Sequence, residues 1–170
     1  MKKLFIVLLI PFIGFSQSDC ENSILVEALE NENINDFFQG ALSVVIEDLS
    51  FLDNCNEDVN YTLFAPGNDI PPESIPILIS VASSEELIDL VNYYIHPETV
   101  NFLEFINGEI EMLDDNLAYI SVQQSIDSYN VMLNQSNITI QDICTCNGVI
   151  HIIDDLIWEP NINSIENQHN

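Results

Sequence analysis

The segment Asn147–Asp154 constrains the fold more than any other stretch, because it predicts a strand that is covered on both faces. It reads NGVIHIID. An Asn-Gly pair readily takes the positive φ values of a tight hairpin turn, and the apolar run after it predicts a β-strand. Its alternating faces carry Val149, His151 and Ile153 on one side, and Ile150 and Ile152 on the other. Both faces are apolar, which indicates a strand in the middle of a sandwich or beneath helices.

Helix-forming patterns occupy the first part of the chain. After Ser23, a good N-cap residue, apolar residues recur at helical spacing. A second helix is expected from about Asn35. Its expected inner face consists of Phe38, Ala41, Leu42, Val45 and Leu49. Ser83 and Glu86 form a capping-box pattern that predicts a third helix, and residues 99–106 predict a short fourth one.

Strand patterns dominate the last third. The expected strands are Tyr61–Ala65, Glu109–Leu113, Leu117–Val122, Tyr129–Leu133, Ile138–Cys144 and the final one from Val149. Helices come first and antiparallel strands later, which predicts an α+β domain. The Tyr61 strand has to join the later sheet from a distance, and this pairing would bring the first and last thirds of the chain together.

Four cysteines indicate an oxidising compartment. They are Cys20, Cys55, Cys144 and Cys146. An even number in an exported chain predicts two disulfides. A bridge between Cys144 and Cys146 would be strained, so we expect each to pair with Cys20 or Cys55, in either arrangement. Zinc binding is the alternative, but CxC lacks the usual CxxC spacing and no nearby His pair completes a site.

The N-terminus predicts export. Lys2 and Lys3 precede an apolar run from Leu4 to Phe15 and then small polar residues, which is typical of a signal peptide over residues 1–18 and is too short for a membrane span. One domain is expected over residues 19–160, followed by a polar tail over residues 161–170. The predicted location is secreted, extracellular or on the cell surface, with the periplasm as the alternative, and no membrane insertion follows signal cleavage.

The charge balance excludes several function classes. Lys2 and Lys3 are the chain's two basic residues other than His, against 28 Asp and Glu, and the net charge is −26. All the acidic residues follow Ser18, so cleavage there would leave 0 − 28 = −28. Nucleic acid and anionic membranes bind through Lys and Arg, so they are excluded as partners. Phosphoryl transfer and Schiff-base chemistry are disfavoured for the same reason.

Three motifs in order resemble the fasciclin (FAS1) domain family of secreted adhesion modules. The opening motif is Thr62, Phe64, Ala65, Pro66 and Asn68. A middle stretch contains Asn134, Ile138, Asp142 and Ile143. The closing motif is Asn147, Gly148, Val149, His151, Ile153 and Asp154. The resemblance implies a wedge or sandwich of antiparallel or mixed β-sheets with N-terminal and flanking helices, in which the opening and closing motifs lie side by side.

The resemblance also suggests a binding segment. In many fasciclin domains a Tyr-His pair followed by apolar residues and Pro has been implicated in integrin-type adhesion. The corresponding residues here are Tyr93, Tyr94, Ile95 and His96. Tyr94 stands in the His position, which weakens the transfer of an integrin role, and an aromatic pair beside Ile95 also fits a core.

The remaining candidate groups have structural explanations. His151 is interpreted as a core histidine with a hydrogen-bond partner rather than an acid–base group, and Asp154 as a cap that accepts backbone N–H groups. Asn68 and Asp142 are interpreted as turn residues. The acidic clusters favour a solvated negative face, with weak calcium binding as the alternative, and no EF-hand or catalytic fingerprint is present in the sequence.

We therefore expect a non-catalytic fasciclin-like adhesion or interaction module without a cofactor, which binds an extracellular protein or polysaccharide. The alternative is an acidic, calcium- or salt-responsive structural protein. The sequence specifies neither the partner's identity nor the oligomeric state.

Overall fold

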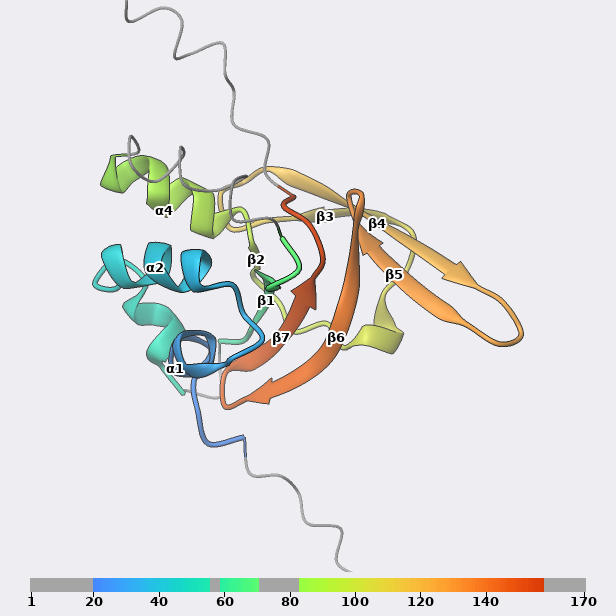
Figure 1. The fold of residues 1–170 in the computed structure, drawn as a ribbon, viewed down its shortest axis with the longest axis horizontal. Helices are drawn as coiled ribbons and strands as arrows, with labels where there is room; N and C mark the ends of the chain where they lie inside the picture. The colour runs from blue at the N-terminus through green and yellow to red at the C-terminus, as the bar shows by residue number, and fades with distance from the viewer. Residues whose placement is uncertain (1–19, 56–58, 71–82, 158–170) are drawn as a thin grey trace, which may run out of the picture.

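The computed structural model describes residues 20–55, 59–70 and 83–157, so the predicted signal peptide and polar tail lie outside the described residues. A single mixed sheet of seven strands forms the body, with the order β2-β1-β7-β6-β5-β4-β3. Its strands are β1 (Tyr61–Pro66), β2 (Ile95–His96), β3 (Gly108–Glu111), β4 (Leu117–Gln124), β5 (Tyr129–Leu133), β6 (Ser136–Thr145) and β7 (Gly148–Ile153). Figure 1 shows the helices on one side of this sheet and the β4–β5 hairpin projecting from the other.

The two central strands come from opposite ends of the domain. β1 pairs in parallel with β7 from Tyr61 opposite Gly148 to Pro66 opposite Ile153, and β6 flanks β7 in antiparallel orientation. Every residue of β7 after Gly148 is buried. The predicted doubly covered strand and the predicted long-range pairing are therefore both confirmed.

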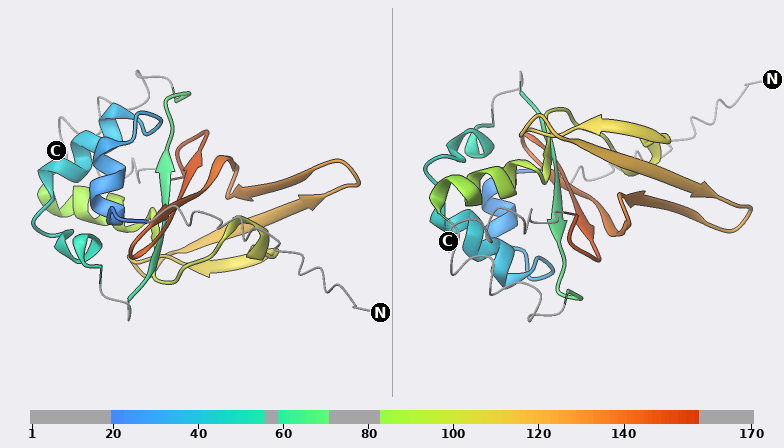
Figure 2. Two further views of the ribbon diagram at one scale, coloured as in Figure 1. Left: turned by 90° about the horizontal axis from the view of Figure 1, so that it is seen from below. Right: turned by 90° about the horizontal axis from the view of Figure 1, so that it is seen from above.

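Three helices cover one face of the central strands (Figure 2). They are α1 (Ile24–Glu30), α2 (Asp36–Val44) and α4 (Ser84–Asn92). Ser23 caps α1 by accepting from Val26 N–H, Asn35 caps α2, and Ser83 with Glu86 forms the predicted capping box of α4. Their apolar stripes pack with Leu63, Ile150 and Ile152 into one core cluster.

The sheet folds into a nearly closed wedge. β5 and β6 pair at only two positions, so the outer strands β3 to β5 diverge from the inner strands β6, β7, β1 and β2. At the far end the two outermost strands meet again, where Leu113 N–H donates to Ile95 C=O at 2.7 Å. This architecture is the α+β wedge that the sequence predicts.

Two of the expected helices are shorter in the structure than the sequence predicts. Residues 99–106 form only the 3₁₀ turn η3 (Phe102–Glu104), because Asn101 and Phe105 on either side of it are extended and the Val100 backbone is bonded to β1 and β7. The helix from Asn35 ends at Val44, while Val45 and Leu49 of its expected inner face stay buried in the turns before η1 (Ser50–Asp53). The strand β2 was not predicted, because two residues carry no periodicity.

Candidate functional site

The turn between β6 and β7 is a junction of four chain segments. Asn147 is fully buried, and its side chain accepts from Ile24 N–H at 2.8 Å and donates to Leu52 C=O at 2.7 Å. Its own carbonyl accepts from Tyr61 N–H at 3.0 Å. Asn147 therefore joins the start of α1, the η1 turn and the start of β1. Such a buried amide is stable only because its donor and acceptor are both used.

The Asn-Gly pair works differently from the predicted hairpin. Gly148 alone of the pair has a positive φ, +147°, while Asn147 is not among the residues with positive φ. A Cβ at Gly148 would overlap the backbone N, C and O atoms of Tyr61. Gly148 is therefore required by the close approach of β1, and Asn147 by its bridging side chain.

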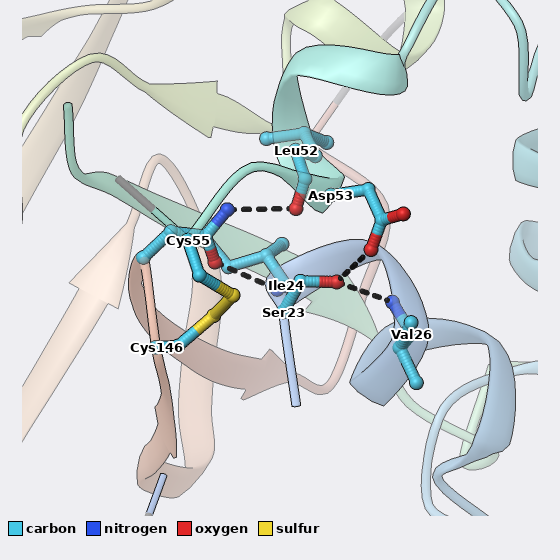
Figure 3. The surroundings of a disulfide bond; sticks show 8 residues. Ser23, Ile24, Val26, Leu52, Asp53, Cys55 and Cys146 are labelled. Carbon is cyan, nitrogen blue, oxygen red and sulfur yellow. Dashed lines mark hydrogen bonds between the residues drawn. A yellow bond between two sulfur atoms is a disulfide. The ribbon is translucent and has the colours of Figure 1, made fainter. Parts of the chain in front are cut away.

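Two disulfides fix this junction, as Figure 3 shows for one of them. Cys20 bonds to Cys144, and Cys55 bonds to Cys146. The first bridge ties the segment before α1 to the end of β6, and the second ties the residues after η1 to the β6–β7 turn. The expectation that each cysteine of the CxC pair bonds to an upstream cysteine is confirmed, and the structure selects one of the two arrangements.

Ser23 and Asp53 connect the same elements next to the Cys55–Cys146 bridge. The Ser23 hydroxyl donates to Asp53 Oδ1 at 2.6 Å while it accepts from Val26 N–H (Figure 3). One hydroxyl therefore caps α1 and joins it to η1, which makes the N-cap part of the junction.

His151 is the buried polar group at the centre of the second face of β7. Its side chain has 0% exposure and lies between the rings of Phe64 and Phe105, at centroid distances of 5.8 and 5.4 Å. Asp142 N–H donates to its Nδ1 at 3.2 Å. Nδ1 is therefore the acceptor, so Nε2 carries the proton and donates to Val100 C=O at 2.9 Å. Both ring nitrogens are engaged, which confirms the interpretation as a core histidine.

Burial lowers the pKa of His151 below its usual value, against the opposing effects of the Val100 hydrogen bond and the Asp142 carboxylate. The carboxylate is a weak partner, since its Oδ1 lies 4.0 Å from Nδ1 and its side chain is 40% exposed. Desolvation wins, because a charged imidazole inside the core would lose its hydration without a close counter-ion. The neutral ring is the form that the fold holds.

Asp142 supplies a third connection through an unusual backbone. It lies at φ 55° within an irregular stretch of β6, where the register shifts between Ile140 and Ile143. Asp and Asn tolerate this left-handed conformation better than other non-glycine residues. The bulge points Asp142 N–H at His151, and the Asp142 carboxylate accepts from Phe102 N–H at 2.8 Å. Asp142 therefore lies in a bulge of β6 rather than in a turn, and its carboxylate positions the η3 segment, a role that the sequence did not predict.

Thr62 holds the other end of that segment. Its buried hydroxyl donates to Glu98 C=O at 2.8 Å and accepts from Val100 N–H at 2.9 Å. Thr62, His151 and Asp142 together bind the backbone from residue 98 to residue 102 across the second face of β1 and β7. Phe102 of this stretch contacts the Tyr129 ring of β5, and the Tyr129 hydroxyl donates to the carbonyl of Phe105 at 3.2 Å, so the segment also contacts the outer strands.

The remaining motif residues are also engaged within the domain. Asp154 accepts from Asn137 N–H at 2.7 Å and from the Asn137 amide at 2.7 Å, which matches its expected capping role. Asn68 donates to Glu32 C=O at 2.7 Å. The other members, Phe64, Ala65, Pro66, Val149 and Ile153, are all buried.

The predicted binding segment is divided between core and surface. Tyr94 and Ile95 are 1% and 0% exposed, and Tyr94 contacts the Phe38 ring at 5.2 Å. Tyr93 is half-buried and its hydroxyl accepts from the Asn134 amide at 3.2 Å. His96 is half-buried as well, and its Nδ1 lies 2.7 Å from Glu111 C=O, where an Nδ1–H donates. Tyr93 and His96 are thus the members of this segment with side chains at the surface, and a binding role for them stays a prediction.

Comparison with known proteins identifies the chain at this point. A family model described as the Fasciclin domain matches residues 22–159. The chain belongs to the fasciclin family. The match spans both disulfides' C-terminal cysteines, the opening strand β1 and the closing strand β7.

Two relatives support the assignment from sequence and from fold. Protein sll1483 of Synechocystis sp. is 22% identical over 152 residues, which cover 87% of this chain and 79% of the relative. A solved FAS1 domain pair from the insect cell adhesion molecule Fasciclin I superposes with a TM-score of 0.54 and 16% identity over 73% of this chain. This fasciclin chain spans 45% of the length of that pair.

Several general properties follow from the family. Fasciclin domains are adhesion and interaction modules in general, and the family is not cofactor-dependent. Within residues 20–55, 59–70 and 83–157, no group of three or more His, Cys, Asp or Glu side chains is placed to hold a metal ion. None of the helices that the structure describes is both long and apolar enough to cross a membrane. The two disulfides and the family fit an extracellular protein.

Sequence reasoning missed the clamp that Thr62 makes on residues 98–100. The one available signal was a Thr in an otherwise apolar strand, TLFAP, where a buried hydroxyl needs partners. That signal predicts a bond but not the segment that supplies it.

Proposed function

We propose that this fasciclin domain acts outside the cytoplasm as a non-catalytic adhesion module that binds an extracellular protein or polysaccharide through its outer surface. The observation that carries the proposal is the state of His151. Both of its nitrogens bond to backbone groups, and aromatic rings flank it. A histidine held in this way stabilises a fold, whereas a general base needs an accessible nitrogen near a substrate.

The negative charge of the chain limits the classes of partner that it can bind. With Lys2 and Lys3 removed by processing, the domain offers no Lys or Arg to an anionic surface. Partners that depend on phosphate or sulfate contacts are disfavoured. Neutral and cationic partners remain, and both occur among extracellular proteins and polysaccharides.

The direct test is retention of whole cells. Protein comprising residues 19–170 is immobilised on beads, and the fraction of the producing organism's cells or of its surface polymer that stays bound is measured. We expect retention above that of an unrelated acidic protein with the same net charge. Equal retention by the two proteins would contradict an adhesive role.

A variant pair tests the family's segment separately. Tyr93→Ser and His96→Ser alter the two side chains of the segment that reach the surface, while Tyr94 and Ile95 stay in the core. If retention falls in both variants with the melting temperature preserved, the segment takes part in binding. Unchanged retention would place the adhesive surface elsewhere on the domain.

A second candidate function rests on the net charge of −26. In this reading the carboxylates respond to calcium or salt, and the folded domain carries them. A field of this size attracts cations diffusely even without an ordered site. The two candidate functions differ in their expected response to calcium, because only the structural-cation function predicts a calcium effect larger than that of magnesium.

A further inference from the structure

The outer hairpin β3–β4 presents two exposed apolar side chains beside two exposed carboxylates. Leu117 and Tyr119 are 56% and 50% exposed. The alternate residues Ala118 and Ile120 are 2% and 0% exposed and belong to the core. β4 therefore has one buried face and one face turned to solvent, as expected for the antiparallel part of a sheet. Figure 2 shows β4 and β5 extending away from the helices, so none of the helices that the structure describes covers this side.

The register places the carboxylates directly beside the apolar pair. Glu109 lies opposite Tyr119, and Glu111 lies opposite Leu117. Opposite residues on adjacent strands point to the same face, with Cβ atoms about 5 Å apart. Both glutamates are exposed. We call the surface formed by Glu109, Glu111, Leu117 and Tyr119 the β3–β4 face.

This face adjoins a sheet edge. β3 is the last strand in the sheet order, so no strand pairs with its outer side, although β2 bonds to its end through Leu113 N–H and the Glu111 carbonyl. The loop bond from Met112 N–H to Asn116 C=O, at 2.8 Å, makes 112 and 116 a bonded pair. Alternation then makes the next pair, Glu111 with Leu117, a non-bonded one, so the Glu111 backbone points to the outer edge. His96 occupies the Glu111 carbonyl there.

A second copy of this chain is a poor occupant. The described residues contain no Lys or Arg, so a copy would bring further carboxylates against Glu109 and Glu111 with no cation to neutralise them. Like charges brought together at an interface cost free energy and reduce association. An occupant that gains from this surface must carry positive charges next to apolar groups.

We propose that the β3–β4 face binds a basic extended segment of a partner protein, in which Lys or Arg and apolar side chains share one face of the segment. Every second residue of an extended chain points to the same face, so a cation at one position can meet Glu109 or Glu111 while an apolar side chain two residues further covers Leu117 or Tyr119. Tyr119 adds a ring face for a Lys or Arg cation. This inference rests on the proposed function that the domain binds a partner.

The test uses a defined probe rather than an unknown partner. The probe is a short synthetic peptide whose odd positions are alternately Lys and Tyr and whose even positions are Ser, and its affinity for residues 19–170 is measured by titration. An analogue with Glu in place of Lys and a Lys homopolymer test charge sign and apolar contact. We expect binding of the probe, none of the Glu analogue, and weaker binding of the homopolymer. Binding should also weaken as added salt shortens the Debye length.

Matched variants locate the site. Glu109→Gln with Glu111→Gln, and Leu117→Ser with Tyr119→Ser, should each raise the dissociation constant about fivefold or more. Glu47→Gln with Asp48→Asn removes the same charge from exposed positions after α2, and it should change the constant less than about twofold. Val44→Ser with Ile46→Ser is the matched apolar control, since those side chains are 59% and 42% exposed.

A measurement on the wild type locates the binding site even if a variant fails to fold. Amide chemical shifts of residues 109–119 should move on probe addition more than those of the helices. Three results would overturn the proposal: no probe binding by the wild type, equal loss in the Glu47/Asp48 control, or shifts at 109–119 produced by a neutral glucan oligosaccharide instead of the probe. Cell retention is measured in parallel. If the β3–β4 variants still retain cells, the proposed adhesive function is kept but does not use this surface. If the wild type itself retains no cells, the proposed function is contradicted.

Discussion

The two disulfides should contribute nearly equal stability despite closing loops of different length. Taken alone, the Cys20–Cys144 bridge closes a sequence separation of 124 and the Cys55–Cys146 bridge one of 91. With the other bridge intact, however, the shortest covalent path changes. It runs from Cys20 to Cys55 along the chain and returns through the two-residue step between Cys144 and Cys146. Either bridge then closes the same loop of about 37 residues.

The loop size sets the expected magnitude. A loop of about 37 residues gives a chain-entropy contribution of about 3.8 kcal/mol at 25 °C, and a loop of 91 to 124 residues gives about 4.6 to 4.9 kcal/mol. Each single deletion should therefore lower the free energy of unfolding by about 4 kcal/mol, and the double deletion by about 8 to 9 kcal/mol. Since small domains have about 5–15 kcal/mol in total, the double deletion should leave little folded protein.

Cavity effects should change these values little. Cys55 and Cys144 are exposed, and Cys20 and Cys146 are half-buried, so truncation to Ala opens little buried volume. The variants are Cys20→Ala with Cys144→Ala, and Cys55→Ala with Cys146→Ala. Each deletion removes a whole bridge and leaves no free thiol to form a new one.

The assay is equilibrium unfolding in urea at fixed salt, because guanidinium would also screen the carboxylate repulsion of this acidic chain. Reduced wild type serves as the reference for the double deletion. A cost below about 1 kcal/mol for either bridge, or a difference above about 1.5 kcal/mol between the two, would refute the shared-loop argument. Peptide mapping that found Cys20 bonded to Cys146 would refute the connectivity itself.

Four further results are expected. Gly148→Ala should cost more than about 4 kcal/mol, because its Cβ would overlap the Tyr61 backbone, whereas Gly40→Ala, with nothing within 4 Å, should gain about 1 kcal/mol; urea unfolding of both checks this. The pKa of His151 is lowered in the folded protein, so as the pH falls the unfolded chain takes up a proton before the folded one does. The contribution of His151 to the free energy of unfolding is therefore present above about pH 6.5 and is lost below it. The slope of the unfolding free energy against pH should be less positive in His151→Asn than in the wild type. Trypsin should leave unfolded residues 19–170 uncut, and any tryptic fragment would contradict the sequence argument. Millimolar calcium should raise the melting temperature no more than matched magnesium, and a much larger calcium effect would favour the structural-cation function.

Sequence reasoning succeeded where a local pattern has one physical outcome. The continuous apolar run of β7 required cover on both faces, and the histidine within it required partners, so its core position followed. The helix caps at Ser23 and Ser83 could be predicted because few residue types satisfy the free N–H groups at a helix start. The disulfide partners followed in part, since geometry excluded a bridge within the CxC pair.

The parts that failed depend on contacts between distant residues. Residues 99–101 have a helical pattern, but Thr62 and His151 bind the Val100 backbone and Asn101 is extended, so these long-range bonds outweigh local propensity. The β6 bulge at Asp142 exists because the His151 ring needs a donor, which no window around Asp142 reveals. β2 exists because Leu63 and Thr62 offer a free strand edge.

The residues of the fasciclin motifs form contacts inside the fold, and this limits where binding specificity can reside. Thr62, Asn147 and His151 are fully buried and satisfied by backbone groups, so a substitution at any of them alters folding before it alters recognition. Recognition is then left to surfaces that the core does not need, and the outer face of the β3–β4 hairpin is one of them. A chain with 28 carboxylates and no cation beyond Lys3 adds a directional constraint, because every exposed face repels its own kind. The same charge that keeps copies of this domain apart favours a basic partner, and added salt should weaken both effects together.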